Sequence, residues 1–188
     1  MIELFGSAYM PTIETERLVL RKLTMRDAAD IFAYSRDPEV ARHVLWDAHR
    51  TIGESKSYIR FMQRKYRACE PASWGIEWKQ TGTVIGTIGY MWIQNDNACA
   101  EVGYSLSRPF WNRGIMTEAL RAVLYHAFND LRLNRVEAIH EVKNPASGAV
   151  MRKCGMRHEG LLREKVYNKG RYVDVEMYAI LRDEFEDI

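Results

Sequence analysis

Residues 99–131 read CAEVGYSLSRPFWNRGIMTEALRAVLYHAFNDL, and this stretch decides the fold. In its first eight residues apolar side chains alternate with small or polar ones, which predicts a strand with one apolar face and Glu101 on the other. After a turn, apolar residues recur every three or four positions from Met116 to Leu131, which predicts a long amphipathic helix. The stretch is therefore interpreted as strand, tight turn and helix in immediate succession.

The turn before this helix has features of an anion site. The first turn of any helix carries unpaired N–H groups and the positive end of the helix dipole. Gly114 lets a phosphate approach the main chain, and Arg108 and Arg113 flank it. A single glycine before a helix is also common in turns that bind nothing, so this segment alone leaves both readings open.

Three segments together carry a resemblance to a known family: AEVGYSL (100–106), PFWNRGIMTEAL (109–120) and NPASGAVMRKCGM (144–156). In order and spacing they resemble the GCN5-related N-acetyltransferases (GNAT), in particular the branch of ribosomal-protein N-terminal (alanine) acetyltransferases. The resemblance spans roughly residues 15–181. It implies a single α/β domain with a mixed, mostly antiparallel sheet, a central splayed parallel strand pair, and helices on both faces.

The resemblance also implies a binding site for acetyl-CoA as co-substrate, with no metal. Main-chain N–H groups from Trp111 to Thr117 would hold the pyrophosphate, and these residues are Trp111, Asn112, Arg113, Gly114, Ile115, Met116 and Thr117. The pantetheine arm would lie along Tyr104, Ser105 and Leu106, with a bulge at Gly103, and Asn144 would fix either this arm or a strand end. The family usually has Gly or Ala where this chain has Met116.

Two residues match catalytic positions of the family. Glu101 is at the position that often supplies the general base, although an ordinary solvated or ion-paired strand residue is the alternative. Ser147 is at the position that donates a proton to the leaving sulfur, whereas a first-turn residue with local bonds only is the alternative. Asn144 also has the alternative role of a helix cap. No cysteine lies where a covalent acyl intermediate would need it.

Two further residues lie near the predicted cleft. His140 falls on the apolar face of the strand after the long helix, where it either assists proton transfer or is a satisfied core histidine, and we leave it out of the catalytic set. Glu141 either meets the acceptor amine or is a solvated strand end. The histidines show no metal-ligand spacing with cysteines or acids, so no metal site is expected.

Composition sets the remaining limits. A chain of 188 residues is expected to form one domain, here residues 13–188 after a leader of residues 1–12. A formal charge of +2 gives no reason to expect nucleic acid, and no apolar run is long enough for a membrane helix. Three scattered cysteines predict neither disulfides nor structural zinc. The start of the chain lacks a secretion signal, so a cytoplasmic location is expected.

The rest of the chain predicts the order of elements. We expect a strand at 17–21, helices at 24–36 and 51–67, a hairpin of strands 74–78 and 84–90, the strand of Glu101, the long helix, a strand at 135–142, a helix at 145–154, and a closing hairpin at 160–167 and 172–181. Capping boxes at Thr24 and Thr51 mark the helix starts. The strand, helix, strand order around Gly114 requires a parallel pair.

These observations predict an enzyme that transfers an acetyl group from acetyl-CoA directly to a primary amine. By the resemblance, the acceptor is a protein N-terminal α-amine. A small-molecule amine such as a polyamine, an amino acid or an aminoglycoside is the alternative, and a non-catalytic CoA-binding sensor is the second class. A homodimer is a family-level expectation, with no nucleic-acid or membrane partner.

Overall fold

The computed structural model describes residues 10–185, so most of the predicted leader lies outside the described residues. The strands are β1 (Ile13–Glu14), β2 (Leu18–Arg21), β3 (Ser73–Trp78), β4 (Thr83–Gln94), β5 (Cys99–Leu106), β6 (Arg135–Glu141), β7 (Arg157–Asn168) and β8 (Arg171–Leu181). The helices are α1 (Ala28–Ser35), α2 (Pro38–Ala41), α3 (Ile52–Arg67), α4 (Ile115–Tyr125) and α5 (Pro145–Lys153). A π-helical turn, His126–Asp130, extends α4.

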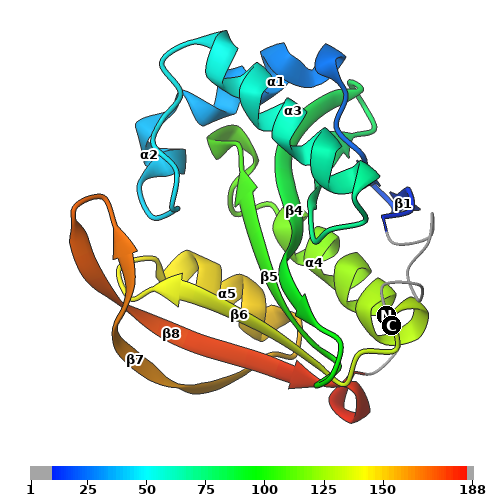
Figure 1. Ribbon diagram of the computed structural model, residues 1–188, viewed down its shortest axis with the longest axis vertical. Helices are drawn as coiled ribbons and strands as arrows, with labels where there is room; N and C mark the ends of the chain where they lie inside the picture. The colour runs from blue at the N-terminus through cyan, green and yellow to red at the C-terminus, as the bar shows by residue number, and fades with distance from the viewer. Residues whose placement is uncertain (1–9, 186–188) are drawn as a thin grey trace.

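The strands form a single eight-stranded sheet in the order β1-β2-β3-β4-β5-β6-β8-β7. Neighbouring strands are antiparallel except β5 and β6, which α4 connects as a crossover helix. Their parallel pairing covers only Cys99–Glu101 and Arg135–Glu137. Beyond it the two strands diverge, as Figure 1 shows on the side that faces α2. The predicted α/β class and splayed parallel pair are confirmed.

The predicted bulge at Gly103 is wrong. The register shift lies on the neighbouring strand β4, between Tyr90 and Trp92, where Met91 is the extra residue. A Cβ added to Gly103 would lie 2.7 Å from the Met91 Sδ atom. Gly103 therefore leaves room for the side chain of the bulged Met91. Close approach of a neighbouring group is a second common reason for a glycine within a strand.

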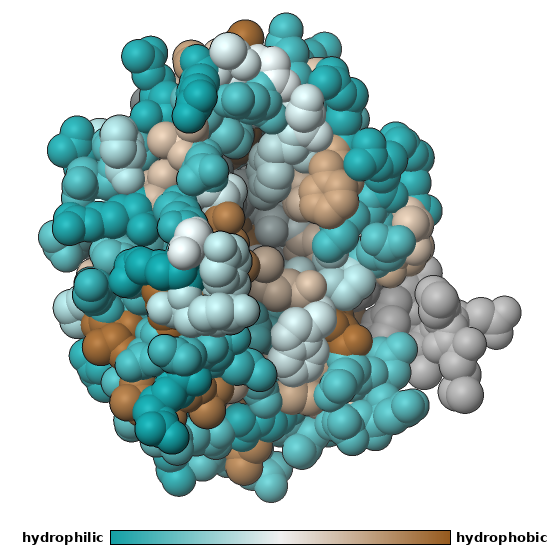
Figure 2. Space-filling view, turned by 60° about the vertical axis from the view of Figure 1, so that its left-hand side comes forward, coloured by the Kyte–Doolittle hydropathy of each residue, from teal (hydrophilic) through white to brown (hydrophobic). Residues whose placement is uncertain are grey.

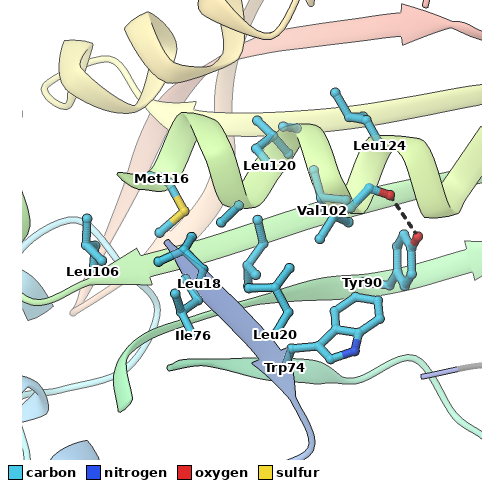
Figure 3. Close-up of a cluster of buried hydrophobic side chains, with 14 of the residues drawn as sticks. Leu18, Leu20, Trp74, Ile76, Tyr90, Val102, Leu106, Met116, Leu120 and Leu124 are labelled. Atoms are coloured by element: carbon cyan, nitrogen blue, oxygen red, sulfur yellow. Dashed lines mark hydrogen bonds between the residues drawn. The ribbon is translucent and has the colours of Figure 1, made fainter. Parts of the chain in front are cut away.

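One face of the sheet packs against α4 (Figure 3). The stripe predicted for this helix is buried at Met116, Leu120 and Val123. Tyr90 of β4 stands at the far end of the same cluster and donates its hydroxyl to the main-chain oxygen of Val123, 3.4 Å away. This apolar layer holds the start of α4 in a fixed position beside the end of β5.

The opposite face is covered by α1 and α3, which pack against each other. Both predicted capping boxes are present, at Thr24 with Asp27 and at Thr51 with Glu54. A 3-10 turn precedes α1, so the first of these helices is shorter than predicted. The early helices are therefore fixed by their own caps, on the face of the sheet where Thr87 and Ser105 point.

The closing hairpin of β7 and β8 is longer than predicted at the β7 end. Its tip is the two-residue turn Lys169-Gly170, in which both residues have positive φ, 49° and 83°. Such turns match the twist of the flanking strands, and glycine or a small polar residue usually occupies them. The hairpin carries Asn168 and Arg171 toward the loop that follows α2.

Candidate active site

Two cavities meet in the gap between β5 and β6. The α3-side cavity, about 340 Å³, lies between α3, the loop after α2, β6 and the closing hairpin. The α4-side cavity, about 280 Å³, lies between the end of β5, the start of α4 and α5. Tyr104, Ser105, Asn144 and Ser147 line both cavities. Figure 2 shows that this face of the molecule is hollowed near its centre. His43 and Val44 of the loop after α2 also line both, so a ligand that extends from one cavity into the other passes between this loop and the four residues of β5 and the start of α5.

The start of α4 forms one end of the α4-side cavity. Gly114 at the helix N-cap has φ 73°, and Asn112 before it has φ 58°, both in the left-handed region. Residues 110–117 line the cavity, and the first-turn N–H groups of α4 have no intrahelical partner. The seven residues that the resemblance implies for pyrophosphate binding, Trp111 to Thr117, are thus brought together at one cavity wall.

Met116 does not block this wall. Its side chain is buried in the core, where only 6% of the residue is exposed, and Figure 3 shows it beside Leu18 on the sheet side of the helix. The larger residue at this position therefore adds to the core, while its main-chain N–H belongs to the first turn of α4. The departure from the family pattern is accommodated by the orientation of the side chain.

Basic side chains around this cavity differ in what they contact. Arg108 forms an ion pair with Asp37, with 2.8 Å between Nε and Oδ2. Arg113 lies over the ring of Phe110 at 5.5 Å, and Lys153 lines the cavity from the end of α5. Of the two flanking arginines that the sequence singled out, Arg113 is the one placed at the cavity wall.

The edge of β5 supplies main-chain groups to the cleft. Ser107 donates its N–H to the Ile85 oxygen of β4, so by alternation the groups of Tyr104 and Leu106 face away from β4, into the gap. The Leu106 oxygen accepts a hydrogen bond from Trp111 Nε1 at 2.7 Å. The N–H and C=O of Tyr104 are therefore the central main-chain groups that a ligand lying along this edge would meet.

Ser147 and Tyr104 form a pair where the cavities meet. The Ser147 hydroxyl donates to the Tyr104 hydroxyl at 3.0 Å, and the Tyr104 hydroxyl donates to the main-chain oxygen of Ser147 at 3.0 Å. Burial raises the pKa of the Tyr104 phenol, so it stays protonated at neutral pH. Asn144 precedes α5, but its side chain makes no capping hydrogen bond and lines both cavities instead.

Glu101 lines the α3-side cavity from the end of the parallel pair. Trp92 Nε1 donates to its Oε2 at 3.2 Å. Burial raises the pKa of the Glu101 carboxyl above its ordinary value, while the Trp92 hydrogen bond acts in the opposite direction. The nearby arginine, Arg135, binds Glu137 and Glu159. Glu101 is therefore neither a fully solvated residue nor an arginine partner.

Glu141 is not a solvated strand end, so that expectation is wrong. Its side chain is 4% exposed, and its two oxygens bind His43 Nδ1 at 3.0 Å and Arg171 Nη2 at 2.6 Å. These two partners hold the pKa of the Glu141 carboxyl below its usual range although burial opposes them. This cluster could not be predicted from the sequence, because its three members come from the loop after α2, from β6 and from β8.

His140 is a buried residue of β6. Its Nδ1 donates to the main-chain oxygen of Glu141 at 2.9 Å, and its ring packs against Tyr178 with 5.6 Å between centroids. A Cβ on Gly148 of α5 would lie 2.5 Å from its Nε2. These contacts favour a packing role for His140, while its buried Nε2 atom has no hydrogen-bond partner among residues 10–185.

Within residues 10–185 no group of three or more His, Cys, Asp or Glu side chains is arranged to hold a metal ion. Over the same range, no helix is long and apolar enough to cross a membrane. The site instead combines a half-buried carboxylate, a hydroxyl pair, an open strand edge and a helix N-terminus. Such a set can hold a diphosphate on one side and take a proton from a ligand on the other.

Comparisons with known proteins agree with this geometry. Residues 17–157 match the family model described as Acetyltransferase (GNAT) domain. An uncharacterized N-acetyltransferase p20 from Bacillus licheniformis is 34% identical over 94% of this chain and 99% of its own length. A ribosomal-protein-serine acetyltransferase from Escherichia coli (strain K12) is 33% identical over 53% of this chain and 56% of its own length. A structure of RimL, a ribosomal L7/L12 α-N-protein acetyltransferase in complex with coenzyme A, superimposes with a TM-score of 0.80 at 22% identity, covering 92% of this chain and 97% of that one.

The family match covers most of the chain, including the start of α4, β5 and α5, which carry the residues on which the resemblance was based. The relatives have acetyl transfer in common, whereas their named acceptors differ or are not given. The chain belongs to the GNAT family of acetyltransferases.

Proposed function

We propose that this enzyme transfers the acetyl group of acetyl-CoA to the α-amine of a protein N-terminus, by direct attack and without a covalent enzyme intermediate. The observation that carries the proposal is the meeting of the two cavities at Tyr104 and Ser147. The α4-side cavity is the donor side, and the α3-side cavity, with Glu101 in its wall, is the acceptor side. The thioester carbon would lie between them.

The residues of the donor side fit acetyl-CoA as co-substrate. The first turn of α4 suits a pyrophosphate, because its N–H groups and helix dipole favour anions. The main-chain N–H and C=O of Tyr104 suit the amide groups of a pantetheine arm, which would extend the sheet by lying along β5. Asn144, whose side chain makes no capping hydrogen bond, supports the arm from the start of α5.

The acceptor side supplies the proton transfers. The acceptor nitrogen attacks the thioester carbon, forming the C–N bond, and the C–S bond then breaks. Glu101 would accept the proton lost by the nitrogen, directly or through water, and its raised pKa makes it a better base than an ordinary glutamate. Ser147 would turn its hydroxyl from Tyr104 to the departing sulfur and donate a proton to it, and the hydrogen bond between the two residues holds the Ser147 side chain at the meeting point of the cavities. Holding both reactants together contributes most to the rate.

The charges of the α3-side cavity favour an acceptor with one amine. Two carboxylates line it, and Glu141 is already bound by His43 and Arg171. That leaves Glu101 for a single ammonium, while Lys65 lines the same wall. A polyamine or an aminoglycoside carries several positive charges, and each one held in the cavity without a carboxylate would be unfavourable. A peptide with one N-terminal amine matches this arrangement.

The proposal is tested by following free thiol release from acetyl-CoA with unblocked peptides, the same peptides with blocked N-termini, and spermidine. Release with unblocked peptides alone supports it. Release with spermidine but with no peptide would establish the small-molecule alternative. Binding of acetyl-CoA without release for any acceptor would establish a sensor. The expected homodimer and cytoplasmic location stay predictions, tested by light scattering and by cell fractionation.

A further inference from the structure

The tip of the closing hairpin is anchored over the α3-side cavity. Lys169 donates its ammonium group to the main-chain oxygens of Ala41 and Val44, the second at 2.9 Å. Arg171, on the other side of the turn, binds Glu141 at 2.6 Å. These contacts fix the hairpin against the loop after α2, so the residue before the turn is held in a defined position.

That residue is Asn168, the last residue of β7. It is 5% exposed, it lines the α3-side cavity, and its side-chain oxygen has no hydrogen-bond partner among residues 10–185. Buried polar atoms nearly always have partners, and an unpaired one costs free energy. Asn168 lines the cavity while this oxygen is itself buried, so the N–H of a ligand can reach the oxygen when the side-chain amide turns toward the cavity.

The surroundings of Asn168 indicate what kind of donor fits. Val166, Val173 and Val175 of the same hairpin line the cavity beside it, so the amide is a polar group within an apolar part of the wall. The carboxylate nearby, Glu141, already binds His43 and Arg171 through its two oxygens. An uncharged N–H suits this position better than a second ammonium group, because no free negative charge is present to compensate one.

We propose that Asn168 selects acceptors that carry an amide next to the reacting amine, by accepting a hydrogen bond from the first peptide N–H. This proposal rests on the proposed function, because it requires that the acceptor amine enters the α3-side cavity toward Glu101. A site that hydrogen-bonds a substrate N–H discriminates against an analogue without it. Asn168 is thus a specificity-determining residue that acts on the part of the acceptor beyond the reacting nitrogen.

The test compares two acceptors that differ in one group: a tripeptide and its analogue with an ester in place of the first amide. The ester keeps the amine and the shape but lacks the N–H. For the wild-type enzyme, kcat/KM for the amide should exceed that for the ester by roughly threefold to tenfold, the value of one hydrogen bond. In Asn168→Leu, which keeps the approximate size but has no acceptor, the ratio should fall to about one.

Two further variants make the result specific. Asn168→Asp keeps an oxygen at the same place and should keep the preference for the amide. Tyr172→Ala removes a ring that is 64% exposed on the same hairpin and should leave the ratio unchanged. Circular dichroism and acetyl-CoA affinity show whether each variant is folded, and the ratio of two acceptors on one protein sample cancels any loss of active enzyme.

The outcomes separate the two proposals. If the wild-type enzyme acetylates the tripeptide and Asn168→Leu keeps the full preference for the amide, the role of Asn168 is refuted while the proposed function stands. The same conclusion follows if the wild-type enzyme does not distinguish amide from ester. If the wild-type enzyme acetylates neither compound but acetylates another amine, the proposed function fails, and the role of Asn168 fails with it.

Discussion

Replacing Trp92 with phenylalanine should raise the pKa of the Glu101 carboxyl and move the acid limb of the pH-rate profile to higher pH. The indole Nε1 donates to Oε2 of Glu101 at 3.2 Å. This hydrogen bond stabilises the ionised carboxylate and therefore lowers its pKa, against the larger effect of burial, which raises it. Phenylalanine fills most of the same space and cannot donate, so the largest of the effects that lower the pKa of Glu101 is removed while the effect of burial remains.

The size of the shift follows from the hydrogen bond. A hydrogen bond to a charged group contributes about 1.5–3 kcal/mol, and one pKa unit corresponds to about 1.4 kcal/mol. At 3.2 Å the bond is longer than most charge-assisted hydrogen bonds, so the lower value applies. The acid limb should move up by about one pH unit. At pH values well above the acid limbs of both enzymes, the wild-type enzyme and Trp92→Phe should have similar rates.

The assay is thiol release at saturating acetyl-CoA, with one peptide acceptor, from about pH 5 to pH 9. The same peptide acceptor is used for every enzyme, so the titration of the peptide amine affects all pH-rate profiles equally. Glu101→Gln should lower the rate by about a hundredfold or more, and Trp92→Phe in that background should no longer shift the limb. An unchanged or downward shift in Trp92→Phe alone, or an equal shift in the double variant, would refute Glu101 as the titrating base.

Three further predictions concern the residues around the cleft. Ser147→Ala should lower kcat by about a hundredfold and leave the dissociation constant of coenzyme A nearly unchanged, as calorimetry would show; equal losses in both would make Ser147 a positioning residue. Glu141→Gln should destabilise the fold at pH 7 by about 1–2 kcal/mol in urea unfolding, because it weakens the ion pair with Arg171, which is half exposed. Since the folded pKa of Glu141 is lowered, the wild-type advantage should be lost as pH falls below about 4.5 through that folded pKa; an advantage that persists in acid would contradict the pairing. Gly148→Ala should lower the free energy of unfolding by about 1–3 kcal/mol, because the new methyl group would lie 2.5 Å from His140 Nε2; an unchanged melting temperature would mean that the ring moves freely.

The donor side of the site was predictable from the sequence because its parts are local. Alternation up to Leu106 gives a strand, a three-to-four-residue period gives the helix, and Gly114 between them gives the turn, so the residues from Tyr104 to Thr117 come together through short-range geometry alone. The parallel pair followed from the connection through a helix. The bulge was assigned to the wrong strand because Gly103 and Met91 meet only through register.

The acceptor side was not predictable from the sequence, because its residues come together only through contacts between distant parts of the chain. Glu141 resembles any carboxylate at a strand end until the fold places His43 and Arg171 against its two oxygens. Asn168 resembles an ordinary turn residue until the hairpin is anchored over the cavity. Neither residue belongs to a periodic pattern or a motif. The two partners of Glu141 lie 98 and 30 residues away from it along the chain. The hairpin tip is anchored by Lys169, which follows Asn168 and binds main-chain oxygens 128 and 125 residues away.

This difference bears on how acceptor choice is encoded in the molecule. A change within 104–117 alters a strand edge and a helix start that act together, so it would affect acetyl-CoA binding for every acceptor. A change of the Asn168 side chain alters one wall of the α3-side cavity and does not touch the α4-side cavity, because Asn168 lines only the first of the two. Acceptor preference can therefore change at Asn168 while donor binding stays constant, and the amide-to-ester ratio measures that independence directly.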